Sequence, residues 1–367
     1  MIWPEIGDWS ATASVSPPAS MADQTQYATL RYFPTQQHKA LNHSKFCYTL
    51  PAIADNYYLI RASFWMGPKE LYPTRIRWQI RFRVIVDTYE GIEVIINFPQ
   101  SNPWFEEMYI PARSGRSSVS VCLSAASNSN DVPFINSVEL RPLPSTMKPA
   151  EMIKNTNYTL RTVWREDSGA YSEVPPILRS VIIDEMMREF KQLGRLIYAC
   201  ILCLELSRYP KDTIHRFWWK LDNSVLYVYQ TIQSVAMEDS YDFPPEAAIQ
   251  SNFINRNIVV NPNARASSNV LTVKTLRGSH YYFMVLWFVE FSANVNASGQ
   301  RVFDVAINGE VFEKAIDIYD RVGPYTALEV YSLTDRPLGP YVEQFVIEVH
   351  NSSTSNYYPS LAAVEIL

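Results

Sequence analysis

Long hydrophobic runs are absent from this sequence. No stretch of about 18 consecutive apolar residues occurs, so nothing predicts a membrane-spanning helix. The first residues, MIWPEIGDWSATASVSPPAS, also lack the basic and apolar segments of a secretory signal peptide. Blocks of lysine and arginine are missing too, and the formal net charge of -5 argues against a nucleic-acid partner. Contact with a membrane would therefore require segments that this chain does not contain.

Histidine is scarce, and the motifs of common catalytic and metal centres are missing. The 5 histidines form no HExxH motif, and neither GxSxG nor a glycine-rich phosphate loop occurs. Glu106 with Glu107, or Asp87 with Glu90, could supply the paired carboxylates of a glycoside-cleaving enzyme. Adjacent carboxylates are more typical of the solvated face of a strand. We therefore expect no catalytic residue, no metal and no cofactor, and keep a glycoside-active enzyme as an alternative.

Cysteine is also limited, because 4 residues are too few for a dense disulfide framework. Cys47 and Cys122 lie in the strand-like runs FCYTLP and VSVCLS, where they could form a disulfide or be buried as thiols. Their spacing does not decide between these alternatives. Cys200 and Cys203 form a CxxC pair, but no second pair or nearby histidine indicates a zinc or redox site.

One pattern is present twice. PFINSVELRPLP covers residues 133–144, and YPSLAAVEIL ends the chain. Each follows a Tyr-Tyr pair that opens a long β-rich run, DNYYLIRASFWM or GSHYYFMVLWFVEF. By residue number, Tyr58 and Pro133 are 75 positions apart, and Tyr282 and Pro359 are 77 apart. So long a period predicts two copies of one domain rather than a solenoid, whose repeats are roughly 20–50 residues long.

Short runs rich in valine, isoleucine, tyrosine and phenylalanine predict many strands, and aromatic residues reach 13% of the chain. Asn308 and Gly309, inside FDVAINGEVF, are typical of a hairpin turn because both tolerate positive φ. We therefore predict a mainly β fold of two tandem β-sandwiches of jelly-roll type, at residues 25–145 and 150–367. The stretch RPLPSTMKPAEM, with three prolines, is the expected linker.

One segment departs from the strand pattern. Within residues 181–206, Ile183, Met187, Phe190 and Ile197 recur at helical steps, with basic residues between them. We predict a helix here, inserted into the second domain over residues 177–206. It could pack on that domain, act as a docking helix, or lie outside the ancestral domain altogether.

Several motifs occur in the order of a known family. LRYFP, CYTLP and YYLIRASFWMG come first, PWFEEMYIPARSGRSSVSVCLSAASNSNDVPFINSVELRPLP follows, and NYTLRTVWREDSG, RYPKDTIHRFW, FVEF, FDVAINGE and AAVEIL complete the series. The chain thereby resembles the malectin-like ectodomain of plant leucine-rich-repeat receptor-like kinases, which carries two tandem malectin folds. It departs from that family in lacking a Cys-Gly first strand, so the first domain looks truncated, and in holding about thirty extra residues between WREDSG and RYP. The transmembrane helix and kinase of the relatives are also missing.

The resemblance implies a non-catalytic, extracellular ligand-binding domain at the cell surface. The implied ligand is a carbohydrate such as a cell-wall glycan. The alternative is a small secreted peptide or protein bound in a groove between the two domains, with a co-receptor protein as a further partner. Aromatic rings in loops could stack on a sugar or anchor a peptide, although packing at sheet edges explains each equally well. These rings are Trp65, Tyr72, Trp104, Phe105, Tyr319 and Tyr325.

Four N-x-S/T sequons match an extracellular family, although roughly three would arise by chance in this composition. The candidate glycosylation sites are Asn42, Asn157, Asn296 and Asn351.

Overall fold

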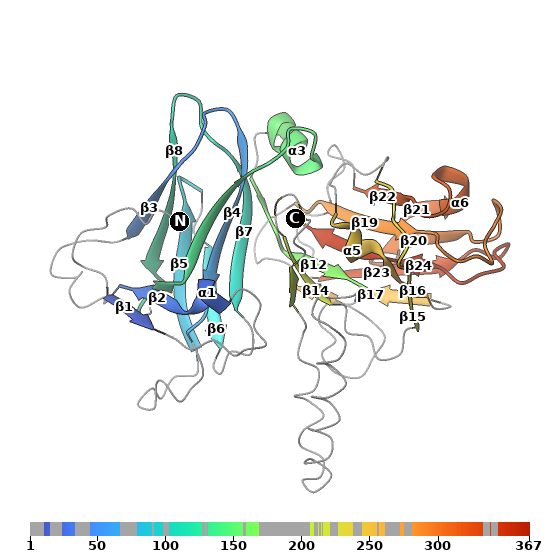
Figure 1. Ribbon diagram of the computed structural model, residues 1–367, viewed down its shortest axis with the longest axis horizontal. Helices are drawn as coiled ribbons and strands as arrows, with labels where there is room; N and C mark the ends of the chain where they lie inside the picture. The colour runs from blue at the N-terminus through green and yellow to red at the C-terminus, as the bar shows by residue number, and fades with distance from the viewer. Residues whose placement is uncertain are drawn as a thin grey trace, which may run out of the picture. The chain divides into compact units, whose positions relative to one another are not determined.

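A computed structural model describes residues 11–14, 24–33, 45–66, 79–89, 92–97, 103–126, 129, 131–156, 159–168, 206–208, 212, 214, 216–220, 227–237, 244–254, 257–260, 272–274, 281–332, 338 and 344–367. The chain divides into a first unit, Met1–Arg161, and a second unit, Thr162–Leu367. Each unit is described by itself (Figure 1).

The first unit is built from two four-stranded antiparallel sheets, with strand orders β3-β8-β5-β6 and β10-β4-β7-β11. A third, small sheet has the order β1-β2-β9. The elements are β1 (Ala11–Ser14), α1 (Gln24–Tyr27), β2 (Thr29–Tyr32), β3 (Phe46–Pro51), β4 (Tyr57–Phe64), β5 (Gln79–Val86), β6 (Ile92–Asn97), β7 (Trp104–Pro111), β8 (Ser118–Ala125), β9 (Phe134–Ile135), β10 (Ser137–Pro142), α3 (Lys148–Thr156) and β11 (Leu160–Arg161).

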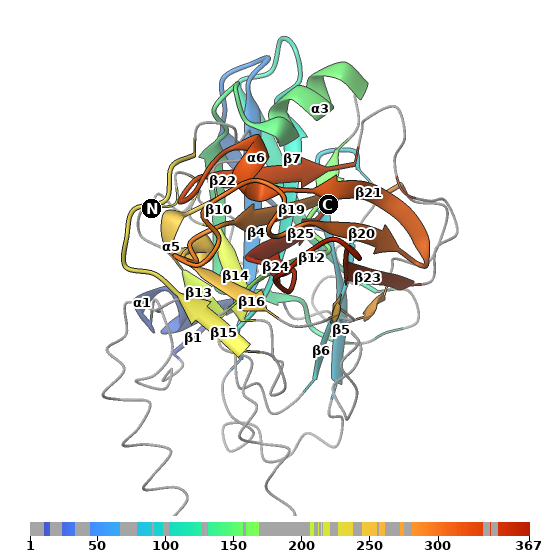
Figure 2. The same ribbon diagram turned by 90° about the vertical axis from the view of Figure 1, so that its right-hand side faces the viewer.

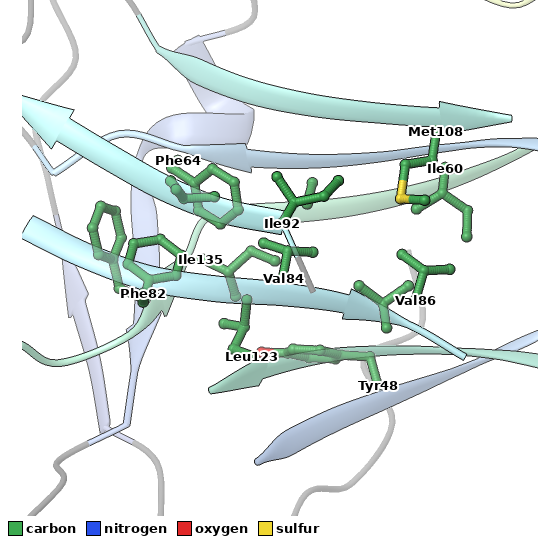
Figure 3. Close-up of a cluster of buried hydrophobic side chains, with 14 of the residues drawn as sticks. Tyr48, Ile60, Phe64, Phe82, Val84, Val86, Ile92, Met108, Leu123 and Ile135 are labelled. Atoms are coloured by element: carbon green, nitrogen blue, oxygen red, sulfur yellow. The ribbon is translucent and has the colours of Figure 1, made fainter. Parts of the chain in front are cut away.

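The core of the first unit lies between the two four-stranded sheets. Along β5, every second side chain is buried, because successive side chains of a strand point to opposite faces. Phe82 from β5 meets Phe64 from β4 edge to face, with ring centroids 5.1 Å apart. Figure 3 shows these rings together with Val84 and Met108, contributed by strands of both sheets. Burying this two-sided apolar cluster is the main stabilising term of a β-sandwich.

The second unit has a larger sheet, β13-β14-β12-β25-β19-β22, which faces the sheet β17-β23-β20-β21, and a small sheet β15-β16-β24. Strand β18 pairs with β23, and α5 packs beside β16 (Figure 2). The elements are β12 (Trp164–Asp167), β13 (Leu206–Arg208), β14 (Phe217–Lys220), β15 (Tyr227–Gln230), α5 (Glu246–Ile249), β16 (Ser251–Ile254), β17 (Asn257–Val260), β18 (Thr272–Lys274), β19 (Met284–Val289), β20 (Phe303–Ile307), β21 (Glu310–Ile316), α6 (Ile318–Arg321), β22 (Ala327–Tyr331), β23 (Gln344–Asn351), β24 (Ser360–Leu361) and β25 (Ala363–Ile366).

The two units repeat one topology. The neighbours β10-β4-β7 of the first unit correspond to β25-β19-β22 of the second, and β3-β8-β5-β6 correspond to β17-β23-β20-β21. Even the small sheets β1-β2-β9 and β15-β16-β24 match. The repeated V-E-L and V-E-I segments form β10 and β25, which pair with β4 and β19 respectively. The prediction of a mainly β fold from two tandem sandwiches is confirmed.

The division between the units falls later than the sequence suggested. The proline-rich stretch that looked like a linker contains the end of β10 and the start of α3, where Pro149 occupies a position that helices tolerate. Helix α3 contacts β7, and β11 pairs with β7, so both belong to the first unit. The helix predicted over 181–206, within the insertion 177–206, lies outside the described residues except for Leu206, which begins β13. Among the described helices, none is long and apolar enough to cross a membrane.

Candidate ligand-binding site

A buried acidic residue follows directly after β19 in the second unit. All six residues of β19 are buried, and Glu290 comes next, with no exposed surface. The backbone N–H of Ser292 donates to Oε1 of Glu290 at 2.9 Å, and Nη1 of Arg301 donates to Oε2 at 2.7 Å. A buried carboxylate needs such partners to offset its lost hydration. This ion pair fixes the start of the loop that joins β19 to β20.

The ion pair forms one wall of a cavity of about 250 Å³. Asn252, on β16, forms another part of the lining, and only 1% of its surface is exposed. Its Nδ2 donates to the Val289 carbonyl at 2.6 Å, whereas its buried Oδ1 has no hydrogen-bond partner among the described residues. The lining residues are Gln230, Asn252, Ile254, Glu290, Phe291, Ser292, Ala293, Asn294 and Arg301.

Helix α6 and the residues after it support the loop that lines the cavity. Asp317 caps α6 by accepting the N–H of Asp320, and it also accepts the N–H of Gly299 in the loop. Tyr325 donates its backbone N–H to the Glu290 carbonyl at 2.8 Å and its hydroxyl to the Phe291 carbonyl at 3.4 Å. Tyr325 was a ligand-binding candidate from the sequence. Its ring is half-buried, and its hydrogen bonds stabilise the loop.

Burial raises the pKa of Glu290 above its ordinary value of 4.5, and the Arg301 guanidinium opposes this effect without cancelling it. The Ser292 N–H also acts to lower the pKa, while the negative charge of Asp317 adds to the rise. A carboxyl whose folded pKa is raised binds its proton more tightly in the folded state. Its contribution to stability is therefore full below the unfolded pKa and is lost as the pH rises through the folded pKa.

We expect Glu290→Gln to remove this pH dependence. In the wild-type chain, Glu290 should make the free energy of unfolding fall as the pH rises from about 4.3 towards neutrality. The variant has no carboxyl at this position, so its free energy of unfolding should lack this fall, and the difference in free energy between the two proteins should change across that pH range. Urea unfolding at a series of pH values measures it. Glu310→Gln, at an exposed position on β21, should follow the wild-type curve. A Glu290→Gln curve parallel to the wild type would contradict the expectation.

A second candidate surface lies in the first unit, at the start of β7. Trp104 is 43% exposed, and its Nε1–H donates to Oε1 of Glu106 at 2.9 Å. Oε2 of Glu106 accepts Nε and Nη2 of Arg161, on β11, at 3.1 and 2.8 Å. The indole is thus held in one orientation with part of its ring open to solvent. Phe105 beside it is half-buried.

The other sequence candidates occupy different environments. Trp65 is only 1% exposed and belongs to the core of the first unit, so its ring is not available for stacking on a ligand. Its backbone N–H donates to Oδ1 of Asn136 at 2.6 Å, just after the end of β4. Tyr319 is half-buried on α6. Tyr72 lies outside the described residues.

The carboxylates considered for glycoside cleavage do not face each other. Glu106 and Glu107 are neighbours on β7, so their side chains point to opposite faces of the sheet. Each is engaged by a different arginine: Arg161 binds Glu106, and Nε of Arg61 donates to Glu107 at 2.6 Å. The interpretation of this pair as a solvated strand face was wrong, since both residues are buried. Asp87 accepts the Ser120 N–H at 2.8 Å. Glu90 lies outside the described residues.

The structure describes the two disulfide candidates and two of the four candidate glycosylation sites. Cys47 and Cys122 are directly opposite on β3 and β8 and form a disulfide. Asn296 is exposed in the loop between β19 and β20, whereas Asn351 is half-buried at the end of β23. Asn42 and Asn157 lie outside the described residues.

The cavity residues were missed at the sequence level. Glu290 interrupts the apolar run MVLWFV, and a charge that ends a fully buried strand is a usable signal. Arg301 and Asn252 carry no comparable signal, because they come from other segments and meet Glu290 only in the fold. Among the residues that the structure describes, no group of three or more His, Cys, Asp or Glu could hold a metal.

Comparison with known proteins gives one consistent family. Residues 8–367 match the malectin-like domain. The ANX1 ectodomain from Arabidopsis thaliana has a similar structure, with a TM-score of 0.63, 14% identity, and coverage of 99% of this chain and 89% of that chain. The structure of the plant receptor-like kinase FER has a TM-score of 0.60 and 17% identity, and the match covers 97% of this chain and 86% of that chain. A chain in the crystal structure of the plant peptide RALF23 in complex with FER and LLG2 has a TM-score of 0.60 and 16% identity. That match covers 97% of this chain and 87% of the other.

The comparison with curated proteins finds no match. The family match covers almost the entire sequence, and the structural similarity spans both sandwich units. The chain therefore belongs to the malectin-like family and has the fold of plant receptor-like kinase ectodomains.

Proposed function

We propose that this chain is a non-catalytic ligand-binding ectodomain that acts outside the cell and binds a small secreted peptide together with a partner protein. The similarity to a chain in the complex of RALF23 with FER and LLG2 supports a peptide over a glycan. The observation that carries the proposal is the cavity beside Glu290, whose lining includes three buried polar side chains, Asn252, Glu290 and Arg301, from separate strands and loops. Small-molecule and peptide sites of proteins typically have such preformed concave surfaces.

Binding without turnover agrees with the arrangement of the acidic residues. A glycoside-cleaving enzyme needs two carboxylates on either side of the scissile bond. Glu106 and Glu107 point to opposite faces of one strand, and each is paired with an arginine. Glu290 is likewise paired, with Arg301. These carboxylates therefore favour structural roles in the fold and at the cavity.

A direct test uses the peptide of the similar complex. The purified chain is immobilised and exposed to RALF23 alone, to LLG2 alone and to both together, in biolayer interferometry. We expect binding of the peptide that becomes tighter when LLG2 is present. A scrambled RALF23 sequence of equal charge is the control. Equal binding of the scrambled and native peptides would refute the proposal. So would the absence of binding by RALF23 together with the absence of binding by a panel of other secreted peptides.

Glycan binding at Trp104 is a second candidate, because the hydrogen bond to Glu106 holds a partly exposed indole ready for stacking. If this surface binds cell-wall oligosaccharides, Trp104→Ala should weaken binding about tenfold, which corresponds to loss of roughly 1.4 kcal/mol of stacking. The free energy of unfolding should fall by no more than about 2 kcal/mol, since the ring is only partly buried. Calorimetric titration and urea unfolding measure both.

Tyr281→Ala provides the matched control, because Tyr281 is an exposed ring of the second unit, away from Trp104 in the sequence. It should leave oligosaccharide binding unchanged. Equal loss of binding in both variants, or a large loss of stability with unchanged binding in Trp104→Ala, would exclude Trp104 as a stacking platform.

A further inference from the structure

The cavity beside Glu290 has the features of a built site. Asn252, Glu290 and Arg301 all line it, and they are 1%, 0% and 4% exposed. Each comes from a different part of the second unit: β16, the end of β19, and the loop before β20. Keeping three polar side chains this deeply buried is costly unless hydrogen bonds compensate for the lost water. Most of that compensation is visible, but two atoms, Oδ1 of Asn252 and Nε of Arg301, have no hydrogen-bond partner among the described residues.

The acceptor without a visible partner is Oδ1 of Asn252. Nδ2 of the same amide is committed to the Val289 carbonyl, so the orientation of the amide is set and the oxygen is the free end. The oxygens of Glu290 each accept one hydrogen bond, from Ser292 and from Arg301. A carboxylate has lone pairs for about four hydrogen bonds, so acceptor capacity remains here as well. Unused acceptor capacity at the cavity therefore lies on Asn252 and Glu290.

The charges around the cavity also favour a cation. Glu290 is paired with Arg301, and Asp317 adds a second negative charge that acts on Glu290. Asp317 is itself held in place by the N–H groups of Gly299 and Asp320. These three ionisable groups carry two negative charges and one positive charge. A cation placed next to Glu290 would balance them.

We propose that this cavity binds a primary ammonium group of a peptide, either a lysine side chain or an N-terminus. An ammonium group has three N–H donors and no acceptor, which matches the free acceptors of Asn252 and Glu290. A sugar hydroxyl carries no charge, so it would leave the excess negative charge of Glu290, Asp317 and Arg301 unbalanced. Because the ligand is taken to be a peptide, this inference rests on the proposed function and names the chemical group that the peptide presents.

The test uses small probes, so that it does not depend on any particular peptide. N-acetyl-lysine-amide carries the ammonium group, N-acetyl-norleucine-amide has a similar chain without it, and glucose supplies hydroxyls. Two-dimensional NMR follows the backbone amide of Ser292 during each titration. We expect the lysine probe to shift this signal in a saturable way, with roughly millimolar affinity, and the other two probes to shift it at least tenfold less.

Two variants in one loop localise the effect. Ala293 is exposed and lines the cavity, so Ala293→Trp should obstruct it and weaken the lysine probe at least tenfold. Ala297 is exposed in the same loop but does not line the cavity, so Ala297→Trp should bind the probe like the wild type. Equal shifts with norleucine or glucose, no saturable shift with lysine, or unchanged binding in Ala293→Trp would each overturn the inference.

Failure here can be separated from failure of the proposed function. If RALF23 with LLG2 binds the chain while the lysine probe does not, the peptide uses another surface and only the ammonium site falls. If the lysine probe binds the cavity while no secreted peptide binds the chain, the site stands and the proposed peptide ligand falls.

Discussion

Replacing Glu365 with glutamine is expected to destabilise the second unit by about 3–5 kcal/mol, because it removes one partner of a buried ion-pair network. Glu365 is the acidic residue of the V-E-I segment on β25 and has no exposed surface. Nε of Arg165 donates to its Oε1 at 2.9 Å, and Nη1 of Arg216 lies 3.5 Å from its Oε2. Glutamine preserves the shape but removes the negative charge that balances Arg165, whereas Arg216 keeps a second carboxylate partner in Asp212 at 3.0 Å.

The equivalent residue of the first unit provides the comparison. Glu139, in the V-E-L segment on β10, contacts Arg61 and Arg141. Its side chain is slightly exposed, and Arg61 keeps a second carboxylate partner in Glu107. Glu139→Gln should therefore cost less, about 1.5 kcal/mol. The repeated glutamate thus has one role in both units and a larger effect where it is fully buried.

Urea unfolding followed by tryptophan fluorescence measures the loss. Trp218 and Trp287 lie in the second unit with ring centroids 5.7 Å apart, and the guanidinium groups of Arg165 and Arg216 lie over the Trp218 ring. Their emission should report on this region directly. If the free energy of unfolding of Glu365→Gln lies within about 1 kcal/mol of the wild-type value, or if Glu139→Gln loses more, the network contributes little to stability.

Much of the fold could be predicted because its signals are local. Alternating apolar residues along β5 mark a strand with one buried face, and the repeated Tyr-Tyr and V-E-L/I segments mark equivalent strands in both units. The hairpin at Asn308-Gly309 follows the same logic, since these residues have φ values of 53° and 80° between β20 and β21. Such patterns depend on near neighbours in the chain, and therefore they survive without knowledge of the tertiary structure.

The candidate site could be predicted only in part, because burial depends on distant segments. Trp65 directly follows β4 and Trp104 begins β7, yet the first belongs to the core and the second is partly exposed. Glu106 and Glu107 looked solvated because their partners, Arg161 and Arg61, lie 55 and 46 positions away. The cavity is assembled in the same way, from residues that only the sheet brings together.

Loss of the Cys47–Cys122 disulfide is expected to destabilise the first unit by roughly 4 kcal/mol. The two cysteines are 75 positions apart, and a crosslink that closes so long a loop strongly restricts the unfolded chain. They join β3 to β8, in the sheet that covers one side of the first core. The double variant Cys47→Ala/Cys122→Ala removes the crosslink without leaving a free thiol at either position. Urea unfolding under oxidising conditions measures the difference.

Reduction of the wild type gives an independent control for this prediction. Dithiothreitol should lower the wild-type free energy of unfolding towards that of the double variant and should leave the variant itself almost unchanged. The packing of β3 against β8 is retained in both, so any shared loss comes from the crosslink. If the free energies of unfolding of the variant and the oxidised wild type differ by less than about 1 kcal/mol, the prediction is wrong. The first core would then hold the two strands together without the disulfide, and the disulfide would not restrict the unfolded chain.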